Sequence, residues 1–138
     1  MFSAAARNPA AAYTRVALDT GARYADDHTL IQLLYDEALV QIGIAREAMV
    51  HQAPQTKGQA INKATTILVE GLLAALDLEA GGELATNLAR LYLYMTEGLV
   101  AAHRTNNLEQ LAEVRDLLEG LRDAWAQIKP APRPLKAA

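Results

Sequence analysis

Apolar residues recur every three or four positions along four stretches of the chain, the spacing that places side chains on one face of an α-helix. This pattern predicts helices from about 29 to 50, 57 to 78, 83 to 104 and 108 to 128. Each is about 33 Å long at 1.5 Å per residue. Because the lengths match and the links are short, neighbouring helices must run antiparallel. The pattern therefore predicts an all-α protein, an antiparallel up-down four-helix bundle.

Residues with capping chemistry mark the predicted helix ends. Thr29 and Thr56 each stand three residues before a glutamine, the capping-box spacing, and predict the starts of the first two helices. Gly81-Gly82 predicts a tight turn between the second and third helices. Asn106-Asn107 predicts the end of the third helix and the cap of the fourth, and Pro130 prevents the fourth from continuing.

Two segments lie outside the predicted bundle of residues 27–128. The N-terminal segment, residues 1–26, has weak helical spacing from Tyr13 to Tyr24. It is predicted to be partly disordered or to form a short cap that covers an apolar groove of the bundle, with its arginines near the acidic fourth helix. The proline-spaced, basic tail, residues 129–138, is predicted to be flexible.

The second helix carries more apolar surface than a single core stripe needs. Beside that stripe runs a lane made mainly of small side chains: Ala60, Ala64, Ile67, Gly71, Ala74 and Leu78. Such a lane forms either a shallow docking groove or a place of close helix packing, and the sequence leaves both open. Tyr92 and Tyr94 stand two positions apart, so their rings point to different faces and one is expected on the surface.

Composition and charge exclude several classes of protein. With no cysteine there is no disulfide framework and no thiolate site, and with no apolar region near the start a cytosolic protein is expected. The formal charge is −3 and no basic stripe stands out, so nucleic acid is not an expected partner. No apolar run approaches the roughly 18 residues that a membrane span needs, so no membrane insertion is expected.

The side chains that perform chemistry are scattered. His28, His51 and His103 have no metal-ligand spacing, and Ser3 is the one serine in the chain. Glu79 and Glu83 flank the Gly81-Gly82 pair and would repel a phosphate group. We therefore expect no catalytic residue, no metal and no cofactor, and we predict that the protein is not an enzyme.

Several linked segments resemble the bacterial flagellar secretion chaperone family FliS. The resemblance covers roughly residues 13–128, and its main motifs are Thr29-Leu30-Ile31-Gln32-Leu33-Leu34-Tyr35-Asp36, Gly81-Gly82-Glu83-Leu84-Ala85-x-Asn87-Leu88, Leu91-Tyr92-x-Tyr94-Met95 and Leu121-Arg122-x-Ala124-Trp125. The chain departs from the family pattern at Glu37, where the family usually has glycine, and at Leu93, where it has an acidic residue. Neither departure is expected to alter the fold, but both fall where they would change the contact surface.

The resemblance implies a chaperone in the cytosol of a flagellated bacterium. Such a chaperone binds the disordered C-terminal segment of flagellin, prevents premature polymerisation and aids delivery to the flagellar type III export apparatus. Other flagellar regulatory proteins are further candidate partners, and the protein is expected to be a monomer or weak homodimer. The alternative is a generic self-associating bundle without a flagellin client.

Matching positions of the family motifs supply the predicted partner contacts. They are Tyr13, Leu34, Tyr35, Ile61, Ala64, Ile67, Leu68, Gly71 and Tyr94. Tyr13 matches a family tyrosine in the segment that covers the groove until the client binds. If Ala64 lines the groove, an Ala64→Glu substitution should weaken peptide binding at least about tenfold and leave the melting temperature nearly unchanged.

Overall fold

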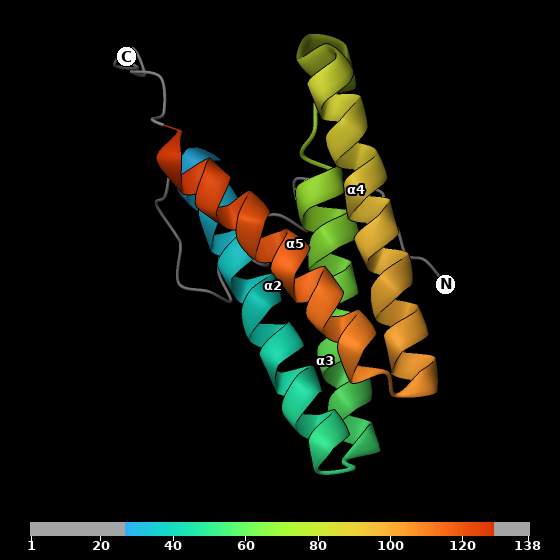
Figure 1. The fold of residues 1–138 in the computed structure, drawn as a ribbon. Helices are drawn as coiled ribbons and strands as arrows, with labels where there is room; N and C mark the ends of the chain where they lie inside the picture. Colours follow the sequence, from blue (N-terminus) through green and yellow to red (C-terminus); the bar gives the residue numbers. More distant parts are fainter. Residues whose placement is uncertain (1–26, 129–138) are drawn as a thin grey trace.

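The computed structural model describes residues 27–128, and these residues form four antiparallel helical arms (Figure 1). The arms are α2 (Asp27–Val50), α3 (Pro54–Thr66) continued by the π-helix η2 (Ile67–Leu73), α4 (Leu78–Thr105) and α5 (Leu108–Gln127). Successive arms run in opposite directions, so the predicted all-α, up-down four-helix bundle is confirmed. The predicted N-terminal segment, with Tyr13, and the predicted tail, residues 129–138, lie outside the described residues.

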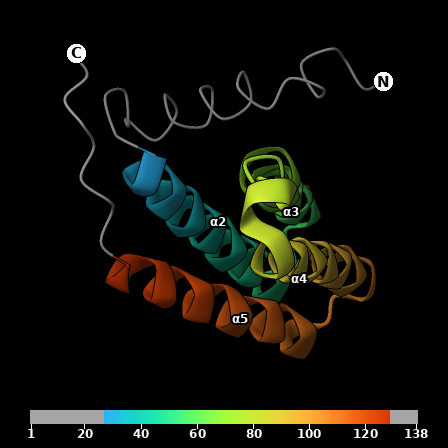
Figure 2. The same cartoon turned by 90° about the horizontal axis from the view of Figure 1, so that it is seen from above.

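The four arms meet closely at one end and diverge at the other. In Figure 1 the end of α2, the start of α3, the end of α4 and the start of α5 lie together, whereas α2 and α5 separate from η2 and α4 at the opposite end. Seen from above in Figure 2, α2 lies between α5 and α3. Helix α2 is therefore the central contact element of the bundle.

Apolar side chains from every arm form one core. The largest of those that are fully buried are Leu34, Ile42, Leu68, Leu72, Met95, Leu99, Leu111, Leu118 and Val114. Helices α4 and α5 approach closely at Gly98, where an added Cβ atom would lie 2.9 Å from Val114 Cγ2. Glycine at this position permits the contact, because any side chain would push the two helices apart.

The link between α4 and α5 has the capping chemistry that the sequence predicts. Asn106 ends α4 in the left-handed conformation, with φ of 54°, and the Asn107 side chain accepts a hydrogen bond from the Gln110 backbone N–H. Lys57 Nζ donates to the His103 carbonyl oxygen at 3.0 Å and to Asn106 Oδ1 at 2.8 Å. The start of α3 thereby supports the end of α4, and a cation at a helix C-terminus is favourable.

Both predicted capping boxes are wrong. Helix α2 already includes Asp27, so Thr29 lies inside it. Helix α3 follows Ala53, which makes no side-chain cap hydrogen bond, and begins at Pro54, so Thr56 lies within the first turn. Proline is favoured at the first helical position because it has no N–H that needs a partner there.

The predicted break at Gly81-Gly82 is also displaced. The second arm ends at Leu73 rather than near Leu78, and Asp77 caps the next helix by accepting a hydrogen bond from the Ala80 N–H at 3.0 Å. The helix begins after Asp77 rather than after Gly82, because the Asp77 side chain pairs a backbone N–H that would otherwise have no hydrogen-bond partner. Gly82 still redirects the chain, since its φ of 57° and ψ of −133° put a kink after the first turn of α4.

The first turn of α2 is joined to the last turn of α5. Trp125 Nε1 donates to the His28 carbonyl oxygen at 2.9 Å, and His28 Nε2 lies 3.0 Å from the Trp125 carbonyl oxygen. The two rings stack with their centroids 4.8 Å apart. This contact holds α2 and α5 together at the end where the bundle diverges, and it places the polar edge of Trp125 at that end.

Candidate functional site

Most of the predicted contact residues lie in the core. Leu34, Tyr35, Ile61, Ala64, Ile67, Leu68 and Gly71 are all buried. Of the two alternatives that the sequence leaves open for the small-residue lane, the structure shows close helix packing from Ala60 to Gly71. Helix α2 packs on this part of the lane, and a Cβ atom at Gly71 would lie 3.3 Å from a Leu34 methyl carbon. Whether these residues touch a partner stays a prediction, as it does for Tyr13.

The two tyrosines of α4 point to different faces, as their spacing predicts. Tyr92 is buried, and its hydroxyl lies 2.6 Å from the hydroxyl of Tyr35 on α2. Burial raises the pKa of both hydroxyls above the usual value for tyrosine. This pair is part of the scaffold rather than of the surface.

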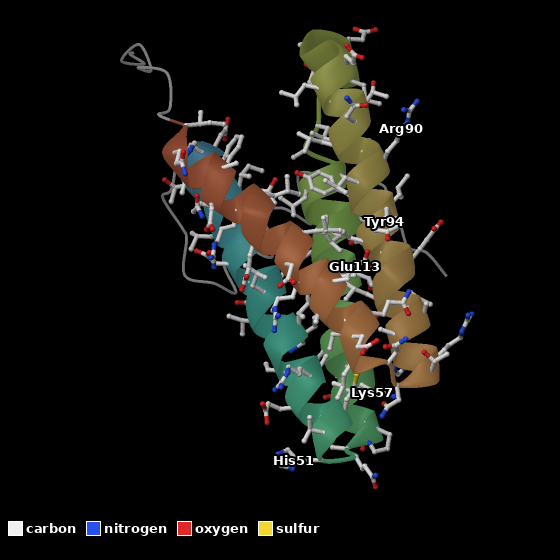
Figure 3. The ribbon with its side chains drawn as sticks, in the orientation of Figure 1. His51, Lys57, Arg90, Tyr94 and Glu113 are labelled. Carbon is white, nitrogen blue, oxygen red and sulfur yellow. The ribbon has the colours of Figure 1, made fainter. Side chains whose placement is uncertain are left out.

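Tyr94 lies on the surface and is 49% exposed. Its hydroxyl donates to Glu113 Oε2 on α5 at 3.1 Å, and Figure 3 labels both residues where α4 and α5 run past each other. That hydrogen bond, followed by the charge of the carboxylate, raises the pKa of Tyr94. The ring of Tyr94 therefore lies on a solvent-facing surface and is linked to α5 by one exposed hydrogen bond.

A first surface depression lies between α3 and α4 and has a volume of about 550 Å³. Ile61 and Val100 are its large apolar lining residues, and Gln55, Gln59 and Asn62 line it with amide side chains. None of its lining residues is a lysine, an arginine, an aspartate or a glutamate. Ile61, one of the predicted contact residues, reaches this α3–α4 depression although most of its side chain is buried.

A second depression, of about 490 Å³, lies where α2 meets the start of α3. Its exposed apolar residues are Val40 and Ile44, and the small residues Gly43 and Ala48 also line it. The sequence reasoning missed this α2–α3 depression. A signal was present, since Val40 and Ile44 stand four positions apart outside the core stripe of α2.

The two depressions are neighbours around the first turn of α3. Ala53 and Thr56 line the α2–α3 depression, whereas Pro54 and Gln55 line the α3–α4 depression. An elongated ligand could pass from one to the other around this corner. A third depression, of about 470 Å³, lies on α5 beside Glu113, the residue that holds Tyr94.

No group of three or more His, Cys, Asp or Glu side chains among residues 27–128 is placed to hold a metal ion. Across the same residues, no helix combines the length and the apolar character that crossing a membrane requires. The surface of the bundle carries three shallow, partly apolar depressions, and residues from all four arms line them.

Comparison with known proteins assigns the family. The family model described as "Flagellar protein FliS" matches residues 9–132. The chain belongs to the FliS family. This FliS-family chain is 40% identical over 119 residues to the flagellar secretion chaperone FliS of Salmonella typhimurium, covering 86% of the chain and 88% of that relative.

Further relatives agree with this assignment. The chain is 42% identical over 113 residues to the flagellar secretion chaperone FliSB of Pseudomonas aeruginosa, with 82% and 89% of the two chains covered. It is 32% identical over 116 residues to the FliS of Escherichia coli, with 84% and 85% covered. Each match spans most of both chains, so the similarity extends over the whole bundle.

Glu37 and Leu93, the two departures from the expected FliS pattern, lie on different helices and make different contacts. Glu37 lies on α2 and accepts a hydrogen bond from Gln41 Nε2 at 2.9 Å. Leu93 lies on α4 beside Tyr94 and is exposed. In this FliS-family chain Leu93 therefore adds an apolar side chain to the outer face of α4, at a position where the resemblance leads us to expect a carboxylate.

Proposed function

We propose that this FliS-family protein is a cytoplasmic export chaperone for flagellin. It binds the disordered C-terminal segment of flagellin, prevents premature polymerisation and aids delivery to the flagellar type III secretion apparatus. The observation that carries the proposal is the family match over residues 9–132, together with curated relatives named flagellar secretion chaperones.

The shape of the surface supports a long, segmented ligand. The depressions lie on different arms, and two of them adjoin around the start of α3. A disordered segment gains affinity by wrapping a large surface, although it gives up chain entropy as it orders. Short amphipathic helices of the client would place apolar side chains in the depressions, as in other helix-in-groove complexes.

Exposed residues are the better candidates for direct contact. Val40 and Ile44 offer an apolar patch on α2, and Val100 offers one on α4. Tyr94 stays a contact candidate, because it is exposed and its hydroxyl donates a hydrogen bond to Glu113. The buried residues among the predicted contacts support these surfaces from inside, and Tyr13 stays a predicted contact.

The mechanism is steric masking and requires no covalent step. While the client segment lies along the chaperone, it cannot pack against other flagellin subunits. The bound complex keeps the segment available for export, because the shallow surfaces hold it by many weak contacts rather than by deep burial. Each such contact contributes little alone, and their sum sets the affinity.

Filament assembly followed by light scattering tests the proposal. With one chaperone per flagellin, scattering by seeded flagellin should stay at the level of the unseeded sample. Flagellin that lacks its C-terminal segment should not bind the chaperone in size-exclusion chromatography. Unchanged assembly in the presence of the chaperone would overturn the proposal.

Self-association is the second candidate, favoured by the exposed Val40 and Ile44 on α2. It predicts that the molar mass of the chaperone alone rises with concentration. The same light-scattering instrument measures that mass. A concentration-dependent dimer that takes up no flagellin would support this candidate against the chaperone proposal.

A further inference from the structure

The hairpin that joins η2 to α4 stands clear of α2 and α5. In Figure 1 this segment, residues 74–84, lies at the top of the picture, where η2 is followed by α4. In Figure 2, seen from above, it lies in front of the α3 and α4 arms. We call residues 74–84 the tip. Leu76 of the tip packs against the core, whereas the side chains of residues 77–84 are exposed and available to a partner.

The tip has a defined conformation. The Asp77 side chain accepts from the Ala80 N–H, and the Asp77 carbonyl oxygen accepts from the Gly81 N–H at 2.8 Å. Gly82 adopts a φ of 57°, and Thr86 Oγ1 donates to the Gly82 carbonyl oxygen at 3.1 Å. These contacts fix the direction in which the tip presents its side chains, and such preorganisation lowers the cost of binding.

Two leucines of the tip are exposed. Leu78 is 55% exposed, and Leu84, at 69%, is the most exposed large apolar side chain among residues 27–128. They are only six positions apart and lie on either side of the kink at Gly82. Both leucines are more than half exposed on a projecting segment, so they can supply apolar contact area to a partner.

The charge around these leucines has one sign. From residue 64 to residue 89 the chain has no lysine, arginine or histidine, and it carries the carboxylates Glu70, Asp77, Glu79 and Glu83. Glu79 and Glu83 are exposed, and neither is ion-paired with a described residue. Arg90, labelled in Figure 3, is the first cation after the tip.

We propose that the tip is a docking site for a cationic amphipathic helix of another protein. Leu78 and Leu84 would contact the apolar face of that helix, and Glu79 and Glu83 would face its lysines or arginines. Complementary charge sets the orientation and the rate of association. The same carboxylates repel phosphate-bearing partners, so neither nucleic acid nor an anionic lipid surface fits this site.

The tip is separate from the proposed client surface. The α2–α3 and α3–α4 depressions lie at the opposite end, near His51 and Lys57 in Figure 3. The docking site therefore does not depend on the identity of the client. A chaperone that holds its client at one end could be recognised through the tip at the other.

A labelled peptide of about 18 residues, five helical turns of lysine and leucine with the leucines on one face, is the probe. Fluorescence anisotropy should show saturable binding to the full-length protein. The double variants Leu78→Ser/Leu84→Ser and Glu79→Gln/Glu83→Gln should each weaken binding at least about tenfold. Because all four side chains are exposed, the thermal melt of both variants should match the wild type.

Matched controls separate docking from general charge attraction. The α5 variant Glu109→Gln/Asp116→Asn removes the same charge elsewhere and should leave peptide affinity within about twofold. A peptide of equal composition with its leucines spread around the helix should bind much more weakly. Equal loss from the α5 and tip variants, or equal binding of both peptides, would overturn the proposal.

A competition experiment distinguishes this site from the client surface. Peptide affinity should be unchanged after saturation with the flagellin C-terminal segment. Displacement of the peptide by that segment would overturn the separate site while supporting the proposed function. Peptide binding with no uptake of the segment would support the tip and count against the proposed client.

Discussion

The hydroxyls of Tyr35 and Tyr92 lie 2.6 Å apart inside the bundle and link α2 to α4. Both side chains are buried, so each hydroxyl depends on the other for its hydrogen bond. The pair joins two arms across the core among apolar side chains such as Leu34 and Met95. It therefore fixes the relative position of the arms that carry the outer surfaces.

Removing one hydroxyl of this pair should lower the free energy of unfolding more than removing both hydroxyls does. Tyr92→Phe leaves the Tyr35 hydroxyl buried without its partner, and we expect a loss of about 1–3 kcal/mol in the free energy of unfolding. The double variant Tyr35→Phe/Tyr92→Phe should recover much of that loss. Urea denaturation of the wild type, both single variants and the double variant measures the coupling; simple additivity of the single losses would contradict it.

The same tyrosine pair should make the free energy of unfolding fall at alkaline pH. Tyrosine in the unfolded chain titrates near pH 10, and burial holds the folded-state pKa of both residues higher. The folded state then keeps protons that the unfolded state releases, so stability is fully present below pH 10 and falls above it. Each tyrosine contributes up to about 1.4 kcal/mol per pH unit. Denaturation midpoints of the Tyr35→Phe/Tyr92→Phe variant should fall less steeply than those of the wild type, and identical slopes would rule the effect out.

Ala64→Glu should unfold the protein rather than merely weaken partner binding. The methyl group of Ala64 is 0% exposed, so the larger, charged side chain has neither space nor a partner. We expect a loss of several kcal/mol, since an unpaired buried charge and overpacking both destabilise. Circular dichroism melting measures it. A melting temperature equal to that of the wild type would show that Ala64 faces an open groove after all.

Two glycines should respond to alanine in opposite directions. Gly82→Ala places a Cβ atom at a φ of 57° and should cost about 1–3 kcal/mol. Gly120 lies on the exposed face of α5 with no atom within 4 Å of an added Cβ, and Gly120→Ala should stabilise by up to about 1 kcal/mol. Chemical denaturation of both variants gives the comparison. Stabilisation by Gly82→Ala would mean that the kink in the tip is not required.

The sequence predicts the number, order and direction of the helices because burial of one face imposes a period on each. It misplaces the link before α4, since both Asp77 and Gly82 carry turn chemistry and periodicity does not rank a helix cap against a kink. Likewise, small residues such as Ala64 and Gly71 suit either a groove or close packing. The position of Leu34 on the neighbouring helix decides between them, and the period of one helix does not contain that information.

The outer surface is harder to predict than the core. The sequence does not single out Val40, Ile44 or Val100. Each is an exposed apolar residue, and such residues are common on the surface of any protein. They become candidate contact residues only because the fold places them in the lining of two shallow depressions around α3. The proposed function rests on membership of the FliS family, and the depressions are the proposed places at which a client binds.

A calorimetric titration with the flagellin C-terminal segment tests the central claim most directly. The wild type should bind one segment per chain. Val100→Glu, at the α3–α4 depression, should weaken binding at least about tenfold, or 1.4 kcal/mol. Val50→Glu, a similarly exposed valine on α2 that lines neither depression, should bind as the wild type does. Absence of binding by the wild type, or equal weakening by both variants, would contradict the account.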